Sequence, residues 1–337
     1  MSKIINTLIN KKCDLPIWFM RQAGRYLPEF RKIRNNNKDF IRLCLNSKLS
    51  AKITVQPLIR YDIDAAIIFS DILLIPYALG QKVSFRKKIG PELSEFDFDI
   101  FKKIKKKKFK KILNPVYQAI KLSKNDMDTK KSLICFIGAP WTLIFYMFGL
   151  KKINGELDVN KFKRKIPEIR KIMAKLTNFS CEHIKNQILA GSDIVQIFDT
   201  WAGLLPKKYI NEFCIKPNLK IVKFCKKNKI PVICFPKGLK KNYKLFVSKV
   251  KPDCISIDYD VNPNWAKLNL KNICIQGGLN PKILLKSEKK LMYELNRYLK
   301  VFSGKPYIFN LGHGIMPNTN PSTVNKIINQ VRSFNGK

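Results

Sequence analysis

Short apolar runs alternate along the chain with longer amphipathic stretches, in the order typical of repeated strand–helix units. Seven runs are clear, and each is short enough to be a buried strand of a parallel sheet: Ala65–Phe69, Leu133–Ile137, Ile194–Phe198, Val232–Phe235, Cys254–Ile257, Ile273–Ile275 and Tyr307–Phe309. The pattern therefore predicts an α/β protein. We expect residues 1–337 to form a single domain, because no Pro-, Gly- or Ser-rich linker divides them.

Two of the intervening helices can be placed from their end signals. Asn114 is suited to cap a helix whose first position is Pro115. A second helix over 178–190 is expected to end at Gly191, because glycine readily adopts the left-handed conformation that closes helices. The lysine-rich segment 101–111 is expected to form a solvated turn that leads into the first of these helices.

One uncharged stretch, Ser132–Leu150, is nearly long enough to span a bilayer. Gly138, Pro140 and Gly149 interrupt it, so a strand, a turn and an apolar helix explain the same residues. The first residues lack the long apolar segment of a signal peptide. We therefore expect no membrane association and a cytoplasmic location.

The residues that follow the seven predicted strands are small or polar. These segments are Ser70–Asp71, Gly138–Trp141, Asp199–Gly203, Pro236–Gly238, Asp258–Tyr259, Gly277–Gly278 and Asn310–Gly314. Barrel enzymes build their sites from loops at the carboxyl ends of the strands, whereas a Rossmann fold would show GxGxxG after its first strand. The pattern predicts a (β/α)8 TIM barrel, regular or distorted, with its active site at the carboxyl ends of the strands.

Composition adds a strong positive charge, with 65 Lys and Arg against 24 Asp and Glu and a formal net charge of +41 at pH 7. Clustered charge of this sign attracts nucleic acid or acidic membranes. Here the lysines are spread over the predicted surface helices among many Ile and Asn, as an A/T-biased coding sequence also produces, and no RNA- or DNA-binding signature accompanies them. We expect no specific nucleic-acid partner.

The nine cysteines include no CxxC pair, which argues against a disulfide framework and against a structural zinc site. Four lie in predicted strands, where a thiol packs as a small apolar group: Cys135, Cys234, Cys254 and Cys274. His183 follows Cys181 by two residues, so the two side chains do not share a helical face and do not make a metal-binding pair. No metal site and no cofactor fingerprint is predicted.

Candidate chemistry begins with two arginines in the segment Trp18–Phe30. Arg21 and Arg25 are four residues apart, so on a helical turn they would share a face, and Gly24 between them would let an anion approach the backbone. A guanidinium binds a planar carboxylate through two parallel hydrogen bonds. The spacing by itself fits an anion clamp and a solvated basic turn equally well.

Trp18–Phe30 closely resembles the N-terminal signature of the uroporphyrinogen decarboxylase family, whose members convert uroporphyrinogen III to coproporphyrinogen III in haem synthesis. Four further collinear segments resemble signatures of the same family: Gln56–Leu73, Gly138–Met147, Gln196–Gly203 and Asn310–Ile315. The loop 276–281 departs from the family pattern, since Gly278 and Asn280 stand where Asn and Asp are more usual, and the hydrogen bonding of that loop is left open.

The resemblance implies a cofactor-free homodimeric enzyme that converts the four acetate side chains of uroporphyrinogen III to methyl groups. It implies that Asp71 lies at the centre of the macrocycle and accepts hydrogen bonds from pyrrole N–H groups, whereas without it a carboxylate at a strand end could simply cap the next helix. It implies catalytic roles for Asp71, Arg21, His313 and Tyr146. Besides Asp71, it implies substrate contacts for Arg21, Gln22, Ala23, Gly24, Arg25, Tyr146, Thr200 and His313.

In such a reaction the substrate is its own electron sink. Protonation of an acetate-bearing pyrrole on carbon gives a cation that draws in the electrons of the breaking C–CO₂ bond, and a nearby carboxylate stabilises that cation. Arginine is a poor conventional acid. The proton donor is therefore open between a water held by Arg21 and the imidazole of His313.

Two other functions are weighed against this one. Barrel relatives that transfer methyl groups need a zinc ion bound by His and Cys, and no Cys lies in the segment of His313. A basic RNA-binding protein on a retired enzyme scaffold would fit the charge, but the intact set of site residues argues against it.

Overall fold

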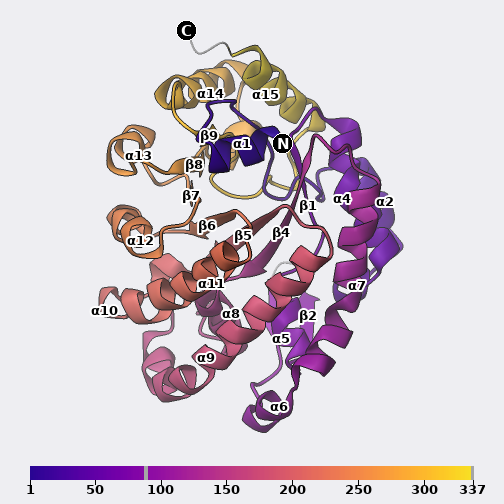
Figure 1. The fold of residues 1–337 in the computed structure, drawn as a ribbon, viewed down its shortest axis with the longest axis vertical. Coiled ribbons are helices and arrows are strands. Elements are labelled where there is room, and N and C mark those ends of the chain that lie inside the picture. The colour runs from indigo at the N-terminus through magenta and orange to yellow at the C-terminus, as the bar shows by residue number, and fades with distance from the viewer. Residues whose placement is uncertain (87–89, 335–337) are drawn as a thin grey trace.

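The computed structural model describes residues 1–86 and 90–334. A parallel sheet with the strand order β1-β4-β5-β6-β7-β8-β9 forms its centre, and the sheet curls so that helices surround it (Figure 1). The strands coincide with the predicted runs to within two residues at each end: β1 Ala65–Ile67, β4 Ser132–Gly138, β5 Ile194–Asp199, β6 Val232–Pro236, β7 Cys254–Ile257, β8 Cys274–Gly277 and β9 Tyr307–Ile308.

The N-terminal segment 16–19 fills the gap between the two edge strands β9 and β1. Ile17 forms a parallel bridge with Phe309, and on its other side the backbone N–H of Asp64 donates to the Ile17 carbonyl at 2.8 Å. The Asp64 carboxylate also accepts from the Ile17 N–H at 2.7 Å. The predicted barrel is confirmed in a distorted form, because this irregular segment takes the place of an eighth strand.

Helices connect the strands and cover the outside of the sheet (Figure 1). Their bounds are α1 Lys3–Ile9, α2 Pro28–Asn35, α3 Phe40–Cys44, α4 Ser47–Arg60, α5 Leu74–Ala78, α6 Phe98–Lys103, α7 Lys106–Asn125, α8 Pro140–Met147, α9 Val159–Leu189, α10 Lys207–Tyr209, α11 Lys216–Lys227, α12 Tyr243–Val250, α13 Pro263–Asn269, α14 Glu288–Phe302 and α15 Pro321–Ser333. A hairpin of β2 Val83–Arg86 and β3 Gly90–Leu93, which the sequence pattern did not predict, follows α5.

Helix α7 begins at Lys106, so the predicted cap at Asn114 and the predicted turn over 101–111 are wrong. Phe109 and Leu113 extend the buried face of this helix toward its start, and the intervening lysines remain in solvent, so burial favours helix over turn. Pro115 then lies inside the helix, at the cost of one backbone hydrogen bond. For the second helix the predicted end is confirmed, since α9 ends at Leu189 and Gly191 has a φ of 107°, but the helix begins at Val159, well before the predicted residue 178.

The uncharged stretch 132–150 forms β4, a turn and α8, as predicted. Within residues 1–86 and 90–334, no helix is both long and apolar enough to cross a membrane.

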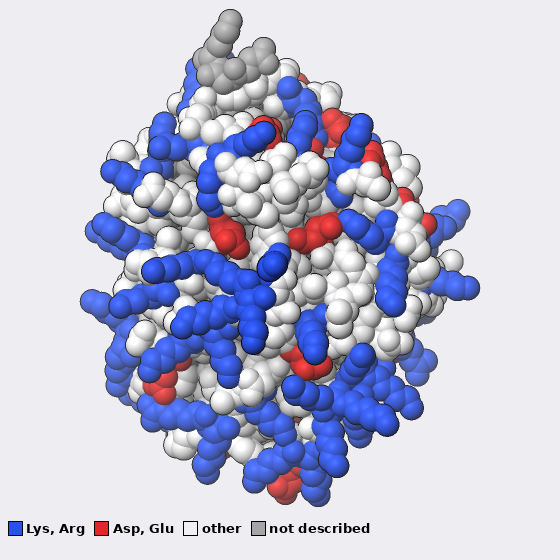
Figure 2. All heavy atoms as spheres, in the orientation of Figure 1, with Lys and Arg blue, Asp and Glu red and all other residues white. Residues whose placement is uncertain are grey.

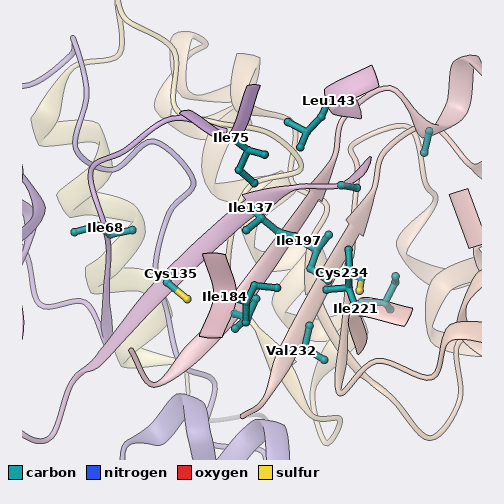
Figure 3. Close-up of a cluster of buried hydrophobic side chains, with 14 of the residues drawn as sticks. Ile68, Ile75, Cys135, Ile137, Leu143, Ile184, Ile197, Ile221, Val232 and Cys234 are labelled. Carbon is teal, nitrogen blue, oxygen red and sulfur yellow. The ribbon is translucent and has the colours of Figure 1, made fainter. Parts of the chain in front are cut away.

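The outer part of the core lies between the strands and the helices. Figure 3 shows Cys135, Ile184, Cys234 and Ile221 in one apolar cluster between the sheet and helices α9 and α11. All nine cysteines are free thiols, and only Cys13 is exposed. The prediction that the strand cysteines serve as small apolar groups is confirmed.

The inner part of the core fills the amino-terminal half of the barrel. Ile4 and Leu8 of α1 pack there against Trp18 and against inward-facing residues near the starts of the strands, among them Ile134, Ile194, Ile233, Cys254 and Cys274. Above this layer, Gln276 accepts a hydrogen bond from Trp18 Nε1 at 2.9 Å and donates to Gln196 at 3.2 Å. Because α1 and these side chains close one end of the barrel, a ligand can enter only from the carboxyl ends of the strands.

Candidate active site

Most of the predicted site residues lie at the open end of the barrel. Asp71 follows β1, Tyr146 lies on α8 after β4, Thr200 follows β5 and His313 follows β9. The segment Arg21–Arg25 continues directly from the residues that complete the barrel wall. The fold therefore brings residues from five separate parts of the sequence to one end of the molecule.

The prediction that Arg21 and Arg25 share a helical turn is wrong. Arg21 has a left-handed backbone with a φ of 62°, and the residues after it form successive turns, closed by a hydrogen bond from Leu27 N–H to the Gly24 carbonyl at 2.9 Å. A left-handed conformation costs a non-glycine residue about 1–2 kcal/mol and persists only where its surroundings enforce it.

Gln22 holds Arg21 in its left-handed conformation. Its fully buried side chain accepts a hydrogen bond from the Phe19 N–H at 3.0 Å and donates to the Ala65 carbonyl of β1 at 2.9 Å. The side chain of Gln22 is thus engaged by the backbone on both sides. Gly24 has a similar local role, since a methyl group added there would lie 2.9 Å from the Arg21 carbonyl oxygen. Ala23 between them is half-buried.

Arg21 stands among the other candidate residues. Its side chain is exposed to solvent, yet desolvation by the surrounding protein lowers its pKa, with Asp71 and Tyr146 acting in the opposite direction and Arg25 adding to the decrease. The side chain thus keeps contact with solvent although protein surrounds much of it. Arg21 therefore lies close to Asp71, Tyr146 and Arg25, so the predicted site residues come together around it.

One carboxylate oxygen of Asp71 is held by the nearby backbone, and the other is available to a ligand. Its Oδ1 accepts a hydrogen bond from the Leu73 N–H at 2.8 Å, immediately before α5, so part of the predicted capping alternative is present. Burial raises the pKa of the carboxyl group to about 6, although the Leu73 N–H and the charge of Arg21 act against the increase. The carboxylate is thus ionised at neutral pH but poorly solvated, which makes it a strong attractor for a cation.

Tyr146 packs against Trp201, the residue that follows Thr200 in the chain. The rings of Tyr146 and Trp201 lie edge to face with centroids 6.0 Å apart, and burial raises the pKa of the Tyr146 hydroxyl. The backbone N–H of Trp201 donates a hydrogen bond to Thr142 Oγ1 at 3.2 Å, and the Thr142 hydroxyl donates in turn to the buried Asp199 at 2.7 Å. Thr200 is half-buried and lies between Asp199 and Trp201 in the chain, directly after β5.

His313 is a neutral imidazole at neutral pH. Burial, together with the charges of Arg21 and Lys237, lowers its pKa to about 3. Its Nδ1 accepts a hydrogen bond from the Gly314 N–H at 2.7 Å, so the ring proton belongs on Nε2. The His313 ring can therefore donate a hydrogen bond from Nε2 but is a weak acid.

The loop that departs from the family pattern supports the His313 segment. The Leu279 carbonyl accepts from the Gly312 N–H at 2.7 Å, and Leu279 forms a parallel bridge with Leu311. Asn280 caps the following short helix Pro281–Leu285 by accepting from the Lys282 N–H at 3.0 Å. The sequence left the hydrogen bonding of this loop open, and the structure shows hydrogen bonds at both Leu279 and Asn280.

His183, which the sequence pattern excluded from a metal-binding pair, lies on α9 and packs against Tyr117 of α7. It is buried on α9, its Nδ1 is 3.0 Å from the Tyr117 hydroxyl, and burial lowers its pKa to about 3. In the two described ranges, no group of three or more His, Cys, Asp or Glu side chains is arranged to hold a metal ion.

Gly314 makes room for Arg21. A methyl group added at Gly314 would lie 2.6 Å from Arg21 Cγ, 3.0 Å from its Nε and closer still to its Cδ. Gly314→Ala is therefore expected to displace the guanidinium and to lower kcat/KM at least about tenfold, since misplacement of a binding group by about 1 Å can cost about 100-fold. The measurement is steady-state kinetics of the variant beside its melting temperature.

The matched control for Gly314→Ala is the same substitution in an Arg21→Ala background. If Gly314 acts by leaving space for Arg21, Gly314→Ala should add nothing to the loss of kcat/KM that Arg21→Ala already causes. Additive losses would contradict this role.

These features define a class of protein, namely a parallel-barrel enzyme whose site presents arginine side chains beside a desolvated carboxylate. The profile of the family described as Uroporphyrinogen decarboxylase (URO-D) matches residues 1–334. The uroporphyrinogen decarboxylase of Rickettsia felis is 39% identical over 347 aligned residues, which cover 100% of this chain and 98% of the relative. That of Orientia tsutsugamushi is 40% identical over 342 aligned residues, with 99% of each chain covered. The chain belongs to the uroporphyrinogen decarboxylase family.

A solved structure supports the fold independently. A methyltransferase from Methanosarcina mazei superposes with a TM-score of 0.75 over 98% of this chain and 96% of its own, at 15% sequence identity. At that identity the likeness shows a common fold alone.

Proposed function

We propose that this member of the uroporphyrinogen decarboxylase family removes carbon dioxide from the four acetate side chains of uroporphyrinogen III and so produces coproporphyrinogen III. Membership of the family supports the reaction. The observation that carries it to particular residues is the convergence of Arg21, Asp71, Tyr146 and His313 at the open end of the barrel.

Asp71 is the electrostatic centre of the proposed reaction. Its carboxylate accepts hydrogen bonds from pyrrole N–H groups, and Oδ1 is already held by Leu73 so that the group cannot rotate freely. When a ring carbon that bears an acetate is protonated, the positive charge of the ring develops beside this carboxylate. A preorganised group of this kind in a water-poor site typically contributes about 3–4 kcal/mol to lowering the barrier.

Arg21 and Arg25 bind substrate carboxylates, with Arg21 beside the reacting acetate. The protonated ring takes the electron pair of the C–CO₂ bond, CO₂ leaves, and a second proton converts the resulting methylene to a methyl group while the ring carbon returns its proton. Each acetate thus consumes one proton. Because His313 is neutral, its Nε2–H serves as a hydrogen-bond donor, and we assign proton delivery to a water held by Arg21.

The remaining contacts are proposed on the same basis. Tyr146 donates its hydroxyl proton in a hydrogen bond, since its raised pKa keeps it protonated. Thr200 contributes its hydroxyl beside Trp201, and Gln22, Ala23 and Gly24 serve the substrate by shaping the turn that presents Arg21. No step of this mechanism calls on a cofactor or a metal ion.

The direct test is anaerobic incubation of purified, chelator-treated protein with uroporphyrinogen III. Chromatography of the oxidised porphyrins should show successive loss of four carboxyl groups at an undiminished rate. Activity that requires added zinc would contradict the cofactor-free mechanism, and an absence of decarboxylation under all conditions would contradict the function.

We further propose that the enzyme is a cytoplasmic homodimer. The family resemblance supports the dimer, and the free thiols of all nine cysteines are compatible with a reducing compartment. Light scattering of the purified protein at several concentrations should give twice the chain mass of 39.1 kDa.

The positive surface is expected to act on substrate capture. Figure 2 shows Lys and Arg side chains spread over much of the visible face with acidic residues among them, so the field is diffuse rather than a single basic stripe. The substrate carries eight carboxylates, and raising salt shortens the Debye length from about 10 Å at 0.1 M to about 3 Å at 1 M. We expect kcat/KM to fall on the order of tenfold over this range with little change in kcat. If kcat/KM is limited by substrate capture and does not change with salt concentration, the lysine excess has no role in capture and reflects compositional drift.

A further inference from the structure

Lys237 lies at the carboxyl end of the barrel strands, directly after β6, and it lies outside the segments that resemble family signatures. Its backbone is clamped between neighbouring loops: its N–H donates to the Asp199 carbonyl at 3.1 Å, and its carbonyl accepts from the Gly203 N–H at 2.9 Å. The next residue, Gly238, donates its N–H to the buried carboxylate of Asp258 at 2.6 Å. The position of Lys237 is thus as well defined as that of a residue in the sheet.

The side chain of Lys237 lies over the ring of Tyr259, which belongs to the loop that follows β7. Its ammonium nitrogen lies 6.0 Å from the centre of the Tyr259 ring. The Tyr259 backbone in turn lies against Gly312, where an added methyl group would come within 3.0 Å of Tyr259 Cα and closer still to its nitrogen. The charge of Lys237 accordingly contributes to the lowered pKa of His313.

Lys237 has no acidic partner in the part of the chain that the structure describes. It is half-buried, and none of the ion pairs between described residues involves it. A partly desolvated ammonium group gains most from an anion that comes to it, because it has already lost part of its hydration. Most lysines of this chain are exposed, so Lys237 differs from the diffuse surface charge.

We propose that Lys237 binds a carboxylate of the tetrapyrrole across the barrel from Arg21, an inference that rests on the proposed function. Both cations act on His313, but Arg21 follows the segment between β9 and β1, whereas Lys237 follows β6, across the barrel from that segment. A macrocycle with carboxylates around its rim can meet both cations while its centre faces Asp71. Lys237 is then a binding residue and takes no part in proton transfer.

The test compares Lys237→Met with Lys237→Arg and with Lys244→Met. Methionine keeps the length of the side chain without its charge, and arginine restores the charge. Lys244 is an exposed lysine on the first turn of α12, seven residues along the chain, and serves as the matched control. Lys237→Met should raise KM for uroporphyrinogen on the order of tenfold or more, which corresponds to about 1.4 kcal/mol, with kcat within about twofold of the wild type. Lys237→Arg should recover most of the loss, and Lys244→Met should behave as the wild type.

Equilibrium binding of the oxidised porphyrins separates this inference from the proposed function. Uroporphyrin keeps all eight carboxylates and coproporphyrin keeps only the four propionates, and neither is turned over. A Lys237-dependent loss of affinity for both assigns the contact to a propionate, and a loss for uroporphyrin alone assigns it to an acetate.

The outcomes are distinguishable. If the wild type binds uroporphyrin in a Lys237-dependent manner but does not decarboxylate uroporphyrinogen, the inference stands and the proposed function fails. If the wild type is active and Lys237→Met matches Lys244→Met in KM and in affinity, the inference is overturned and the function stands. A wild-type protein that neither binds these porphyrins nor decarboxylates uroporphyrinogen would overturn both.

Discussion

Asp71→Asn should lower kcat/KM for uroporphyrinogen on the order of 100-fold or more without unfolding the protein. The amide keeps the size of the carboxyl group and can still accept the hydrogen bond from the Leu73 N–H, so the turn before α5 is preserved. What is lost is the negative charge beside the ring that becomes protonated. Turnover close to that of the wild type would refute the electrostatic role. Asp99→Asn, on the exposed surface of α6, is the matched control.

The pH profile gives a second measure of the same group. With a pKa of about 6, Asp71 loses its charge as the pH falls through that value, so kcat/KM of the wild type should decline on the acid side. His313 cannot cause this decline, because its pKa of about 3 leaves it neutral throughout the range. The buried Asp199 also has a pKa raised to about 6. Loss of the acid limb in the residual activity of Asp71→Asn would assign it to Asp71, whereas its retention would point to Asp199.

The contribution of Asp71 to the free energy of unfolding should change with pH in the opposite direction to its contribution to kcat/KM. Burial raises the pKa of Asp71 from 3.8 to about 6, so the folded protein binds this proton more tightly than the unfolded chain does. The stabilising contribution is therefore present below about pH 4 and is lost as the pH rises through 6. Asparagine has no charge to desolvate, so Asp71→Asn should match or exceed the wild type in free energy of unfolding above pH 6, with the advantage shrinking toward pH 4. A markedly less stable variant at pH 7 would contradict this account of the site.

Arg21→Lys is expected to be the second most damaging conservative change, with a loss in kcat/KM on the order of 100-fold. Lysine keeps the positive charge, and it experiences the same left-handed backbone as arginine, so the backbone strain at this position does not change. It loses the planar fork that holds a carboxylate in one orientation, although its Cγ and Cδ can still pack against Gly314. Most of the effect should fall on kcat, because orientation of the reacting acetate is a requirement of the chemical step.

The control for Arg21→Lys is Arg164→Lys on α9, where the arginine is exposed and the substitution should be silent. Thermal unfolding of both variants shows whether the fold is intact. If Arg21→Lys binds and turns over the substrate as the wild type does, the guanidinium fork is not required and the proposed carboxylate clamp is wrong.

The spacing of apolar runs was sufficient to predict the parallel sheet. Buried parallel strands are apolar on both faces, so runs such as Ile194–Phe198 stand out from their surroundings, and the polar residues after them mark the open end of the barrel. The sequence also led to Asp71 and His313, because each follows such a run and lies in a segment that resembles a family signature. Lys237 could have been found by the same signal, since it too directly follows a predicted strand.

The start of α7 and the closure of the barrel could not be predicted in this way. Asn114 and Pro115 are good start signals, but burial of Phe109 and Leu113 against the rest of the protein outweighs a local cap. Segment 16–19 has too few residues to show a period, and its partners are Phe309, near the far end of the chain, and Asp64, beyond the next three helices.

By itself the sequence determined the strand–helix order, the end of the barrel that carries the chemistry and the identity of the charged groups, because periodicity, turn residues and motifs are local properties of the chain. Only the tertiary structure decided how those groups act. The left-handed bend at Arg21 depends on Gln22 reaching β1, the space for its guanidinium depends on Gly314, and the pKa values of Asp71 and His313 depend on burial by residues distant in sequence. Desolvation and close packing arise between segments that the chain brings together only on folding, and no local pattern records them.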